Sequence, residues 1–96
     1  MTTYKLEFLP SALKEWRALD NAVREQFKRK LLERLENPRV DSARLSTMGD
    51  CYKIKLAALG YRMVYRVEES RVTVEVISVG KRERGTVYSV ARDRLK

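Results

Sequence analysis

The second half of the chain contains three stretches with strand-like alternation, and the turns between them are very short. The stretches are residues 51–56, 61–68 and 71–79, separated by residues 57–60 and 69–70. Neighbouring strands that run parallel need a crossover of about a dozen residues or more. Turns this short therefore predict two consecutive hairpins and an antiparallel meander. The short turns restrict the possible folds more than any other feature of the sequence.

The first half of the chain predicts one strand and then two helices. Residues 4–8 alternate apolar and charged side chains, as a half-buried strand does. Residues 10–19 carry apolar side chains at three- and four-residue spacing, and Pro10 is tolerated in the first turn of a helix. We expect Ser11 to help cap this helix, and Asp20 to cap the next one.

The second helix is expected to run to about residue 36, where Asn37-Pro38 ends it. Its apolar side is predicted to consist of Val23, Phe27, Leu31, Leu32 and Leu35. Its opposite side carries basic residues among glutamates, a mixture that is typical of a solvated face with local ion pairs. The basic residues on that side are Arg24, Lys28, Arg29 and Arg34.

These elements predict an α+β fold. The N-terminal strand is followed by a helical hairpin that packs on one face of a small, largely antiparallel four-stranded sheet, and a short C-terminal helix lies near residues 86–95. Gly80 is expected to break the last strand. Residues 39–50 have no clear period and are expected to form a connecting loop anchored by Leu45 and Met48. The other face of the sheet is predicted to be open and basic.

Composition predicts one globular domain that spans residues 1–96. The chain has 96 residues, 44% of them hydrophobic. Cys51 is the single cysteine, which fits a reducing compartment, so we expect a cytoplasmic protein. No apolar run approaches the ~18 residues of a membrane span, and no membrane contact is expected. Cys51 has no histidine anywhere to activate it, so we interpret it as a packing residue.

Positive charge gathers in the second half of the chain. The 21 Lys and Arg exceed the 13 Asp and Glu by a net +8, and most of the excess lies in residues 51–96. Such a charge suits an anionic partner. In an extended strand Lys53 and Lys55 point to the same face, about 7 Å apart. Because two ammonium groups this close repel each other, we interpret the pair as a contact for a phosphate backbone.

RNA can be cut without a metal when its own 2′-hydroxyl attacks the adjacent phosphate. The reaction needs a base for the 2′-proton, stabilisation of the charged transition state and protonation of the leaving 5′-oxygen. The chain has no histidine, no zinc-type cluster and no nucleotide-binding loop, so we expect neither a metal nor a cofactor. Crowding by other cations is expected to lower the pKa of Lys55 and make it a usable base. The residues expected to converge are Lys53, Lys55, Arg62 and Arg82, with Tyr88 nearby as a platform on which a base stacks.

Motifs along the whole chain resemble the bacterial RelE toxins. They are ALKEWR at 12–17, VREQ at 23–26, DCYKIKL at 50–56, GYR at 60–62, ISVGKRER at 77–84 and VYS at 87–89. The resemblance implies an endoribonuclease that cuts messenger RNA in the A site of the 70S ribosome. It also implies a RelB-like antitoxin that inhibits the toxin. Operator DNA would be bound only through the complex of the two proteins, which represses their operon.

The resemblance also implies a role for each matching residue. Lys55 would be the general base and Lys53 its electrostatic partner. Arg62 would stabilise the phosphate in the transition state, Arg82 would be a general acid or a phosphate clamp, and Tyr88 would stack on a base of the codon. The RNA- and ribosome-binding residues expected beyond these five are Lys28, Arg29, Arg44, Lys81 and Arg84.

Two other interpretations compete with the nuclease. A ParE-type toxin would use the same scaffold to bind DNA gyrase without cutting RNA, since a fold does not decide a function. A small nonspecific nucleic-acid-binding protein would bind free RNA in a strongly salt-dependent way, again without cleavage. The two strand lysines together with Arg82 and Tyr88 favour the nuclease, because a toxin that only binds has no need of them.

Overall fold

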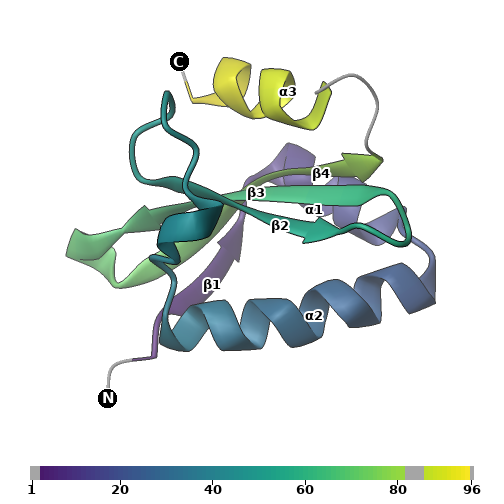
Figure 1. The fold of residues 1–96 in the computed structure, drawn as a ribbon, viewed down its shortest axis with the longest axis horizontal. Coiled ribbons are helices and arrows are strands. Elements are labelled where there is room, and N and C mark those ends of the chain that lie inside the picture. The colour runs from purple at the N-terminus through teal and green to yellow at the C-terminus, as the bar shows by residue number, and fades with distance from the viewer. Residues whose placement is uncertain (1–2, 82–85, 96) are drawn as a thin grey trace.

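The structure is a computed structural model that describes residues 3–81 and 86–95. Its elements in chain order are β1 (Lys5–Phe8), α1 (Pro10–Arg17), α2 (Asn21–Glu36), the 3₁₀ turn η1 (Asp41–Ala43), β2 (Cys51–Leu56), β3 (Tyr61–Glu68), the 3₁₀ turn η2 (Glu69–Arg71), β4 (Thr73–Lys81) and α3 (Thr86–Arg94) (Figure 1). Across these residues, no helix has the length and apolar character that crossing a membrane requires.

The four strands form one sheet in the order β1-β4-β3-β2. β2, β3 and β4 pair antiparallel, and β1 pairs parallel with β4 at one edge. The predicted meander and the α+β class are therefore confirmed. β1 can pair parallel with β4 because α1, α2, β2 and β3 lie between the two strands in the sequence. They provide more than the dozen or so residues that a crossover between parallel strands requires.

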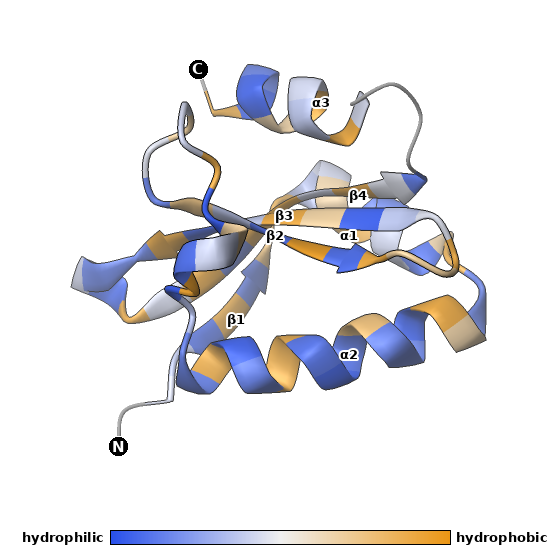
Figure 2. Cartoon of the chain, viewed as in Figure 1, coloured by the Kyte–Doolittle hydropathy of each residue, from blue (hydrophilic) through white to orange (hydrophobic). Residues whose placement is uncertain are grey.

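One face of the sheet carries α1 and α2, and the main core lies between these layers (Figure 1). Apolar segments run along the central strands, whereas apolar and polar segments alternate along α2 (Figure 2). The helices contribute buried Ala12, Val23, Phe27 and Leu31 to this core, and the sheet contributes Tyr52, Ile54, Leu56, Met63, Tyr65, Val67, Val74, Val76 and Val79. The predicted helical layer on this face is confirmed.

The other face of the sheet is not open, which corrects the prediction. Cys51, Val64 and Ile77 form a second core there with Val87 and Ala91 of α3. Leu45 and Met48 pack against the same cluster, so both expected loop anchors are confirmed. Alternation along a strand shows which residues share a face, but it does not show whether a distant helix covers that face.

A β-bulge in β4 makes this second core possible. In the pairing with β3, Val64 lies opposite Ser78 and Tyr65 lies opposite Val76, so Ile77 is the extra residue. Ile77 and Ser78 therefore both face α3, and the Ser78 hydroxyl donates a 2.8 Å hydrogen bond to the Val87 carbonyl. The bulge keeps Val76 and Val79 together in the main core, although positions three apart in a regular strand face opposite sides.

The ends of β4 also differ from the prediction. Gly80 does not break the strand, because it pairs with Arg62 and β4 continues to Lys81. A Cβ at Gly80 would lie 3.5 Å from the Cγ2 of Val87, which is ordinary van der Waals contact, so Gly80 lies directly beside α3. At its start β4 begins two residues later than expected, because η2 ends in Val72 with the left-handed φ of 47°.

The helix bounds agree with the sequence, but the expected caps do not form. Ser11 lies inside α1, and Leu9 takes the N-cap position without a side-chain hydrogen bond. Asp20 is the N-cap of α2, again without a side-chain bond. Leu32 is 59% exposed. It was expected on the buried side, but a helix turns ~100° per residue, so Leu31 and Leu32 cannot both face the sheet.

Two arginines of α2 are not on a solvated face, contrary to the expectation. Arg24 reaches back to the C-terminal end of α1, where its Nη1 donates to the Leu19 carbonyl at 2.9 Å. Carbonyls at a helix end lack partners within the helix, and a cation stabilises them. Arg34 points inward to β2 and β3: its Nη1 donates to the Lys53 carbonyl at 3.1 Å and to the Tyr65 hydroxyl at 2.9 Å.

Replacing Tyr65 with Phe is expected to reduce the free energy of unfolding by roughly 1–3 kcal/mol. The buried Tyr65 hydroxyl donates to the Pro38 carbonyl at 2.6 Å and accepts from Arg34, so its removal leaves a buried carbonyl without its donor. Urea denaturation measures the change. Tyr61→Phe is the matched control, because the Tyr61 hydroxyl makes no hydrogen bond to the described residues. Equal losses for both variants would contradict the prediction.

Candidate active site

The register of β2 and β3 places three of the predicted site residues on one face. Lys55 lies directly opposite Arg62, and Lys53 lies opposite Val64. Directly opposite residues of an antiparallel pair have Cβ atoms about 4.5–5.5 Å apart. Val64 belongs to the core under α3, so all three basic side chains project to the α3 side of the sheet.

Arg62 is the most enclosed of these cations. It is only 8% exposed, and its Nη1 has no hydrogen-bond partner among the residues that the structure describes. A buried guanidinium N–H without a partner is costly, and buried polar groups are nearly always paired. Gly80 lies opposite Arg62 on β4 and contributes no side chain to fill the space. The arrangement suits an anion that completes the hydrogen bonding of Arg62.

Tyr88 reaches the same face from α3. It is half-buried and packs against the second core, which contains Val64, the neighbour of Arg62 two residues along β3. The structure thus places Lys53, Lys55, Arg62 and Tyr88 on one side of the sheet. Arg82, and Arg84 beyond it, lie outside the described residues.

A salt bridge between α1 and α3 holds α3 on the sheet. Arg94 Nη1 and Nη2 donate to the two carboxylate oxygens of Glu15 at 2.8 and 3.0 Å, and Nη1 also donates to the Ile77 carbonyl at 2.8 Å. Glu15 in turn accepts from the Val79 amide at 3.1 Å. This bidentate contact joins both helices to β4 and fixes the element that carries Tyr88.

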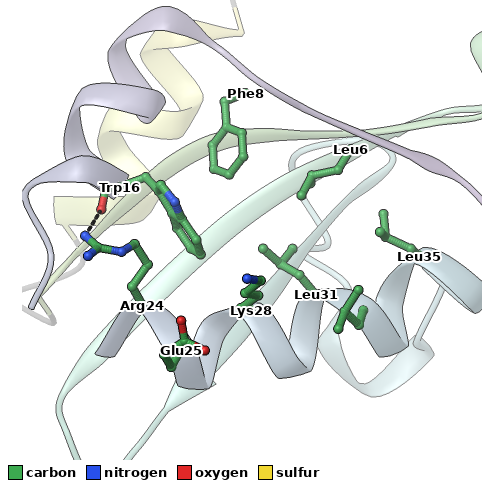
Figure 3. Close-up of a pocket in the computed structure, with 9 residues that line it drawn as sticks. Leu6, Phe8, Trp16, Arg24, Glu25, Lys28, Leu31 and Leu35 are labelled. Atoms are coloured by element: carbon green, nitrogen blue, oxygen red, sulfur yellow. Dashed lines mark hydrogen bonds between the residues drawn. The ribbon is translucent and has the colours of Figure 1, made fainter. Parts of the chain in front are cut away.

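The four further basic residues expected to bind RNA, as far as the structure describes them, do not converge. Lys28 lines an apolar groove of about 320 Å³ beside β1, on the side of α2 that faces α1 (Figure 3). Arg29 lies on the outer side of α2, next to Lys30. Arg44 is exposed at an isolated bridge to β2. Lys81 ends β4, paired with Tyr61 of the main core.

A cationic cleft at the outer edge of β2 was not expected from the sequence. The cleft, of about 280 Å³, lies between α2, η1 and β2. Its lining consists of Lys30, Arg34, Ser42, Ala43, Lys53, Ile54 and Lys55. Lys30 and Arg34 are one helical turn apart, and like charges at that spacing destabilise a helix. That spacing was the one signal of this site in the sequence.

Several carboxylates of the described residues form ion pairs with arginines other than Arg62. Arg39 bridges Asp50 at 2.6 Å and Glu69 at 2.7 Å, and this contact lowers the pKa of the Glu69 carboxyl. Arg66 follows Arg62 and Val64 on the same strand face, but its Nη2 contacts Glu75 at 2.6 Å and Glu68 at 2.8 Å. Arg66 is therefore largely neutralised, in contrast to Arg62.

The thiol of Cys51 is not a reactive nucleophile. Cys51 is fully buried, and burial raises the pKa of its thiol to about 11, so it stays protonated at neutral pH. This agrees with its interpretation as a packing residue. In residues 3–81 and 86–95 no three His, Cys, Asp or Glu side chains are grouped so that they could hold a metal ion.

Known proteins match this chain over nearly its full length. The family model described as ParE toxin of type II toxin-antitoxin system, parDE, matches residues 6–85. The mRNA interferase toxin RelE of Escherichia coli strain K12 is 58% identical over 92 residues, which cover 96% of this chain and 97% of that protein. The mRNA interferase RelE of Shigella flexneri matches with the same identity and coverage.

Solved structures agree with the sequence matches. A mutant form of E. coli toxin RelE in the free state has a TM-score of 0.90 at 54% identity, and the match covers 98% of this chain and 99% of that chain. RelE in the intact E. coli RelBE toxin-antitoxin complex has a TM-score of 0.82 at 58% identity, covering 84% and 99% of the two chains. With this identity over nearly the whole length, the chain belongs to the RelE family of toxins, within the superfamily of type II toxins that includes ParE.

Proposed function

We propose that this toxin is an endoribonuclease that cuts messenger RNA in the A site of the translating ribosome. The observation that carries the proposal is Arg62, a buried arginine whose Nη1 has no partner among the described residues. It lies directly opposite Lys55 on one face of the sheet. Relatives at 58% identity bear the name mRNA interferase RelE, which supports the same conclusion.

The chemistry follows from the groups on this face. Lys55 in its neutral form takes the proton of the ribose 2′-hydroxyl, and the 2′-oxygen attacks the adjacent phosphorus. The bond from phosphorus to the 5′-oxygen breaks, which leaves a 2′,3′-cyclic phosphate on one fragment and a 5′-oxyanion on the other. The 5′-oxyanion takes a proton from water and becomes a 5′-hydroxyl. Arg62 donates to the non-bridging oxygens, where negative charge develops in the transition state. Lys53, on the same strand face, adds positive potential that favours both the anionic phosphate and a neutral Lys55.

Arg82 and Tyr88 complete the proposed site. An arginine with its usual pKa above ~12 is a poor proton donor. We therefore assign Arg82 to neutralising the charge on the leaving 5′-oxygen rather than to acid catalysis in the strict sense. Tyr88 on α3 offers a ring on which a base of the codon stacks, a contact that tolerates any base and is worth ~1–3 kcal/mol.

In the proposed mechanism, the ribosome aligns the 2′-hydroxyl with the leaving oxygen, which the residues of the toxin do not do by themselves. Lysines and arginines neutralise and position a phosphate, but they form no strong acid–base pair like two histidines. In-line alignment of the 2′-hydroxyl with the leaving oxygen must then come from a message held in one conformation, and such alignment contributes a large part of a rate enhancement. Free RNA is expected to be cut poorly.

The proposed partners are a RelB-like antitoxin, the 70S ribosome with its message, and operator DNA through the antitoxin complex only. Structures of relatives at 56–58% identity contain a toxin together with RelB or a RelB peptide. A chain with a net charge of +8 suits an acidic inhibitory segment that neutralises the basic face.

Mapping of message ends after brief induction of the toxin tests this function. The expected result is a set of new 5′-hydroxyl ends inside translated codons, in phase with the reading frame, and none in untranslated regions. Cells that express Lys55→Ala serve as the control. Unchanged messages combined with broken chromosomal DNA would instead favour the gyrase-binding alternative. Cuts independent of translation would contradict the ribosomal A site.

A further inference from the structure

We propose that the cationic cleft at the edge of β2 binds a backbone phosphate of the message that flanks the scissile phosphate. This inference rests on the proposed nuclease function and extends it by a second RNA subsite. The cleft of about 280 Å³ has walls from α2, η1 and β2. Lys30 and Arg34 of α2 bring two cations to it, and Ser42 adds a hydroxyl. Lys53 and Lys55 line it from β2, and their side chains project to the face of Arg62.

In the described part of the chain, no carboxylate lines the cleft. Among the described residues no ion pair joins Lys30, Arg34 or Lys53 to an acidic side chain, whereas other arginines of the fold, such as Arg39, Arg66 and Arg71, are paired with glutamates or aspartates. Cations that gather without counter-ions repel one another and contribute nothing to stability. A bound anion removes that repulsion, and the hydroxyl and guanidinium donors suit phosphate oxygens.

Arg34 is held in place for such a contact. Its Nη1 is fixed by the Lys53 carbonyl and the Tyr65 hydroxyl, and its guanidinium lies 5.8 Å from the centre of the Tyr65 ring. Nε and Nη2 have no partner among the described residues, so donors of a rigidly oriented guanidinium remain for a ligand. Lys30, one turn earlier on α2, is exposed and can follow the ligand.

The position of the cleft identifies the ligand as the message. Lys53 and Lys55 line the cleft, and the same two residues project to the face of Arg62, where the scissile phosphate is proposed to bind. An anion in the cleft therefore lies just across the edge of one strand from the reacting phosphate. A continuous RNA strand that bends over this edge places one of its own phosphates there. A second hollow along α2 shares Lys30 with the cleft and is lined by Gln26, Arg29 and Glu33 as well.

Single-turnover cleavage on programmed ribosomes, with the toxin varied to saturation, tests the subsite. Lys30→Ala is expected to raise the half-saturating toxin concentration on the order of tenfold and to reduce its salt dependence, while the saturated rate stays within about twofold. Lys14→Ala is the matched control, because it removes the same charge from an exposed position of α1. Cleavage by the unmodified toxin in the same assay tests the proposed function separately.

Messages that carry one neutral methylphosphonate linkage identify the phosphate. At one position next to the A-site codon, the neutral linkage should raise the half-saturating concentration for the unmodified toxin but cause no further change in Lys30→Ala. If Lys30→Ala weakens binding equally with every message, the cleft contacts ribosomal RNA and the proposal is wrong. The proposal is also wrong if Lys30→Ala matches Lys14→Ala, or if it changes only the affinity for the antitoxin.

Discussion

Replacing Arg62 with Ala is expected to lower the saturated rate of single-turnover cleavage ~10²–10³-fold, while the affinity for the ribosome changes little. The loss corresponds to one charge-assisted contact made mainly in the transition state, worth roughly 3–4 kcal/mol. Arg62 is 8% exposed, so its side chain has little freedom to move before the message binds. Its Nη1 has no partner among the described residues and remains a donor for the phosphate. Such preorganisation makes its contribution large.

Arg66 supplies the matched control for Arg62. It lies on the same strand and face, but Glu75 and Glu68 pair with its guanidinium. Arg66→Ala is therefore expected to leave the saturated rate within about threefold, and circular dichroism checks that both variants are folded. Arg62→Lys, which keeps the charge but not the planar pair of donors, should recover only part of the rate. If Arg62→Ala merely loosened ribosome binding and kept the saturated rate, Arg62 would be a docking residue.

Replacing Lys55 with Ala is expected to lower the saturated rate by ~10²–10⁴, the usual contribution of general acid–base catalysis. Lys53→Ala should lower it less, because Lys53 acts through its charge and takes no proton. Thermal stability should hold or rise in Lys53→Ala, since this variant removes one of several like charges that share a strand face. Single-turnover cleavage over a range of pH values is the measurement.

The pH dependence separates a base from a mere cation at position 55. For the unmodified toxin the rate should rise with pH as the Lys55 ammonium loses its proton, and then level off. Lys55→Arg keeps the positive charge but cannot lose a proton near neutral pH. It should be as slow as Lys55→Ala and should lack this rise. An arginine variant with nearly full activity and the same pH profile would exclude Lys55 as the general base.

The placement of the proposed site was readable from the sequence because it depends on local geometry. Alternation along a strand fixes the face of Lys53, Lys55 and Arg62, and hairpin turns of two to four residues fix which strands are neighbours. The bounds of β2 and β3 agree with the prediction for the same reason. The roles of the residues came from motifs that resemble RelE toxins, and the charge pattern alone left the nuclease and a plain nucleic-acid-binding protein both open.

Other features were decided by contacts between segments far apart in the chain. The cover of α3 over the basic face depends on how residues 86–95 pack on the sheet. The bulge at Ile77 and the continuation of β4 through Gly80 depend on the pairing of β4 with β3. No periodicity within one segment contains that information. The position of Arg34 could not be predicted from the sequence for the same reason. Its neighbours on α2 are typical of a solvated face, but Arg34 donates to the Tyr65 hydroxyl and the Lys53 carbonyl and points toward the sheet.

The sequence by itself determined the order of elements, the antiparallel meander and the shared face of the strand cations, because each follows from the spacing of nearby residues. Only the tertiary structure decided that this face is partly covered, that Arg62 is buried beneath it, and that α2 and β2 enclose a cationic cleft. Burial and enclosure are properties of two or more surfaces in contact, and the energy that brings those surfaces together is summed over the whole core.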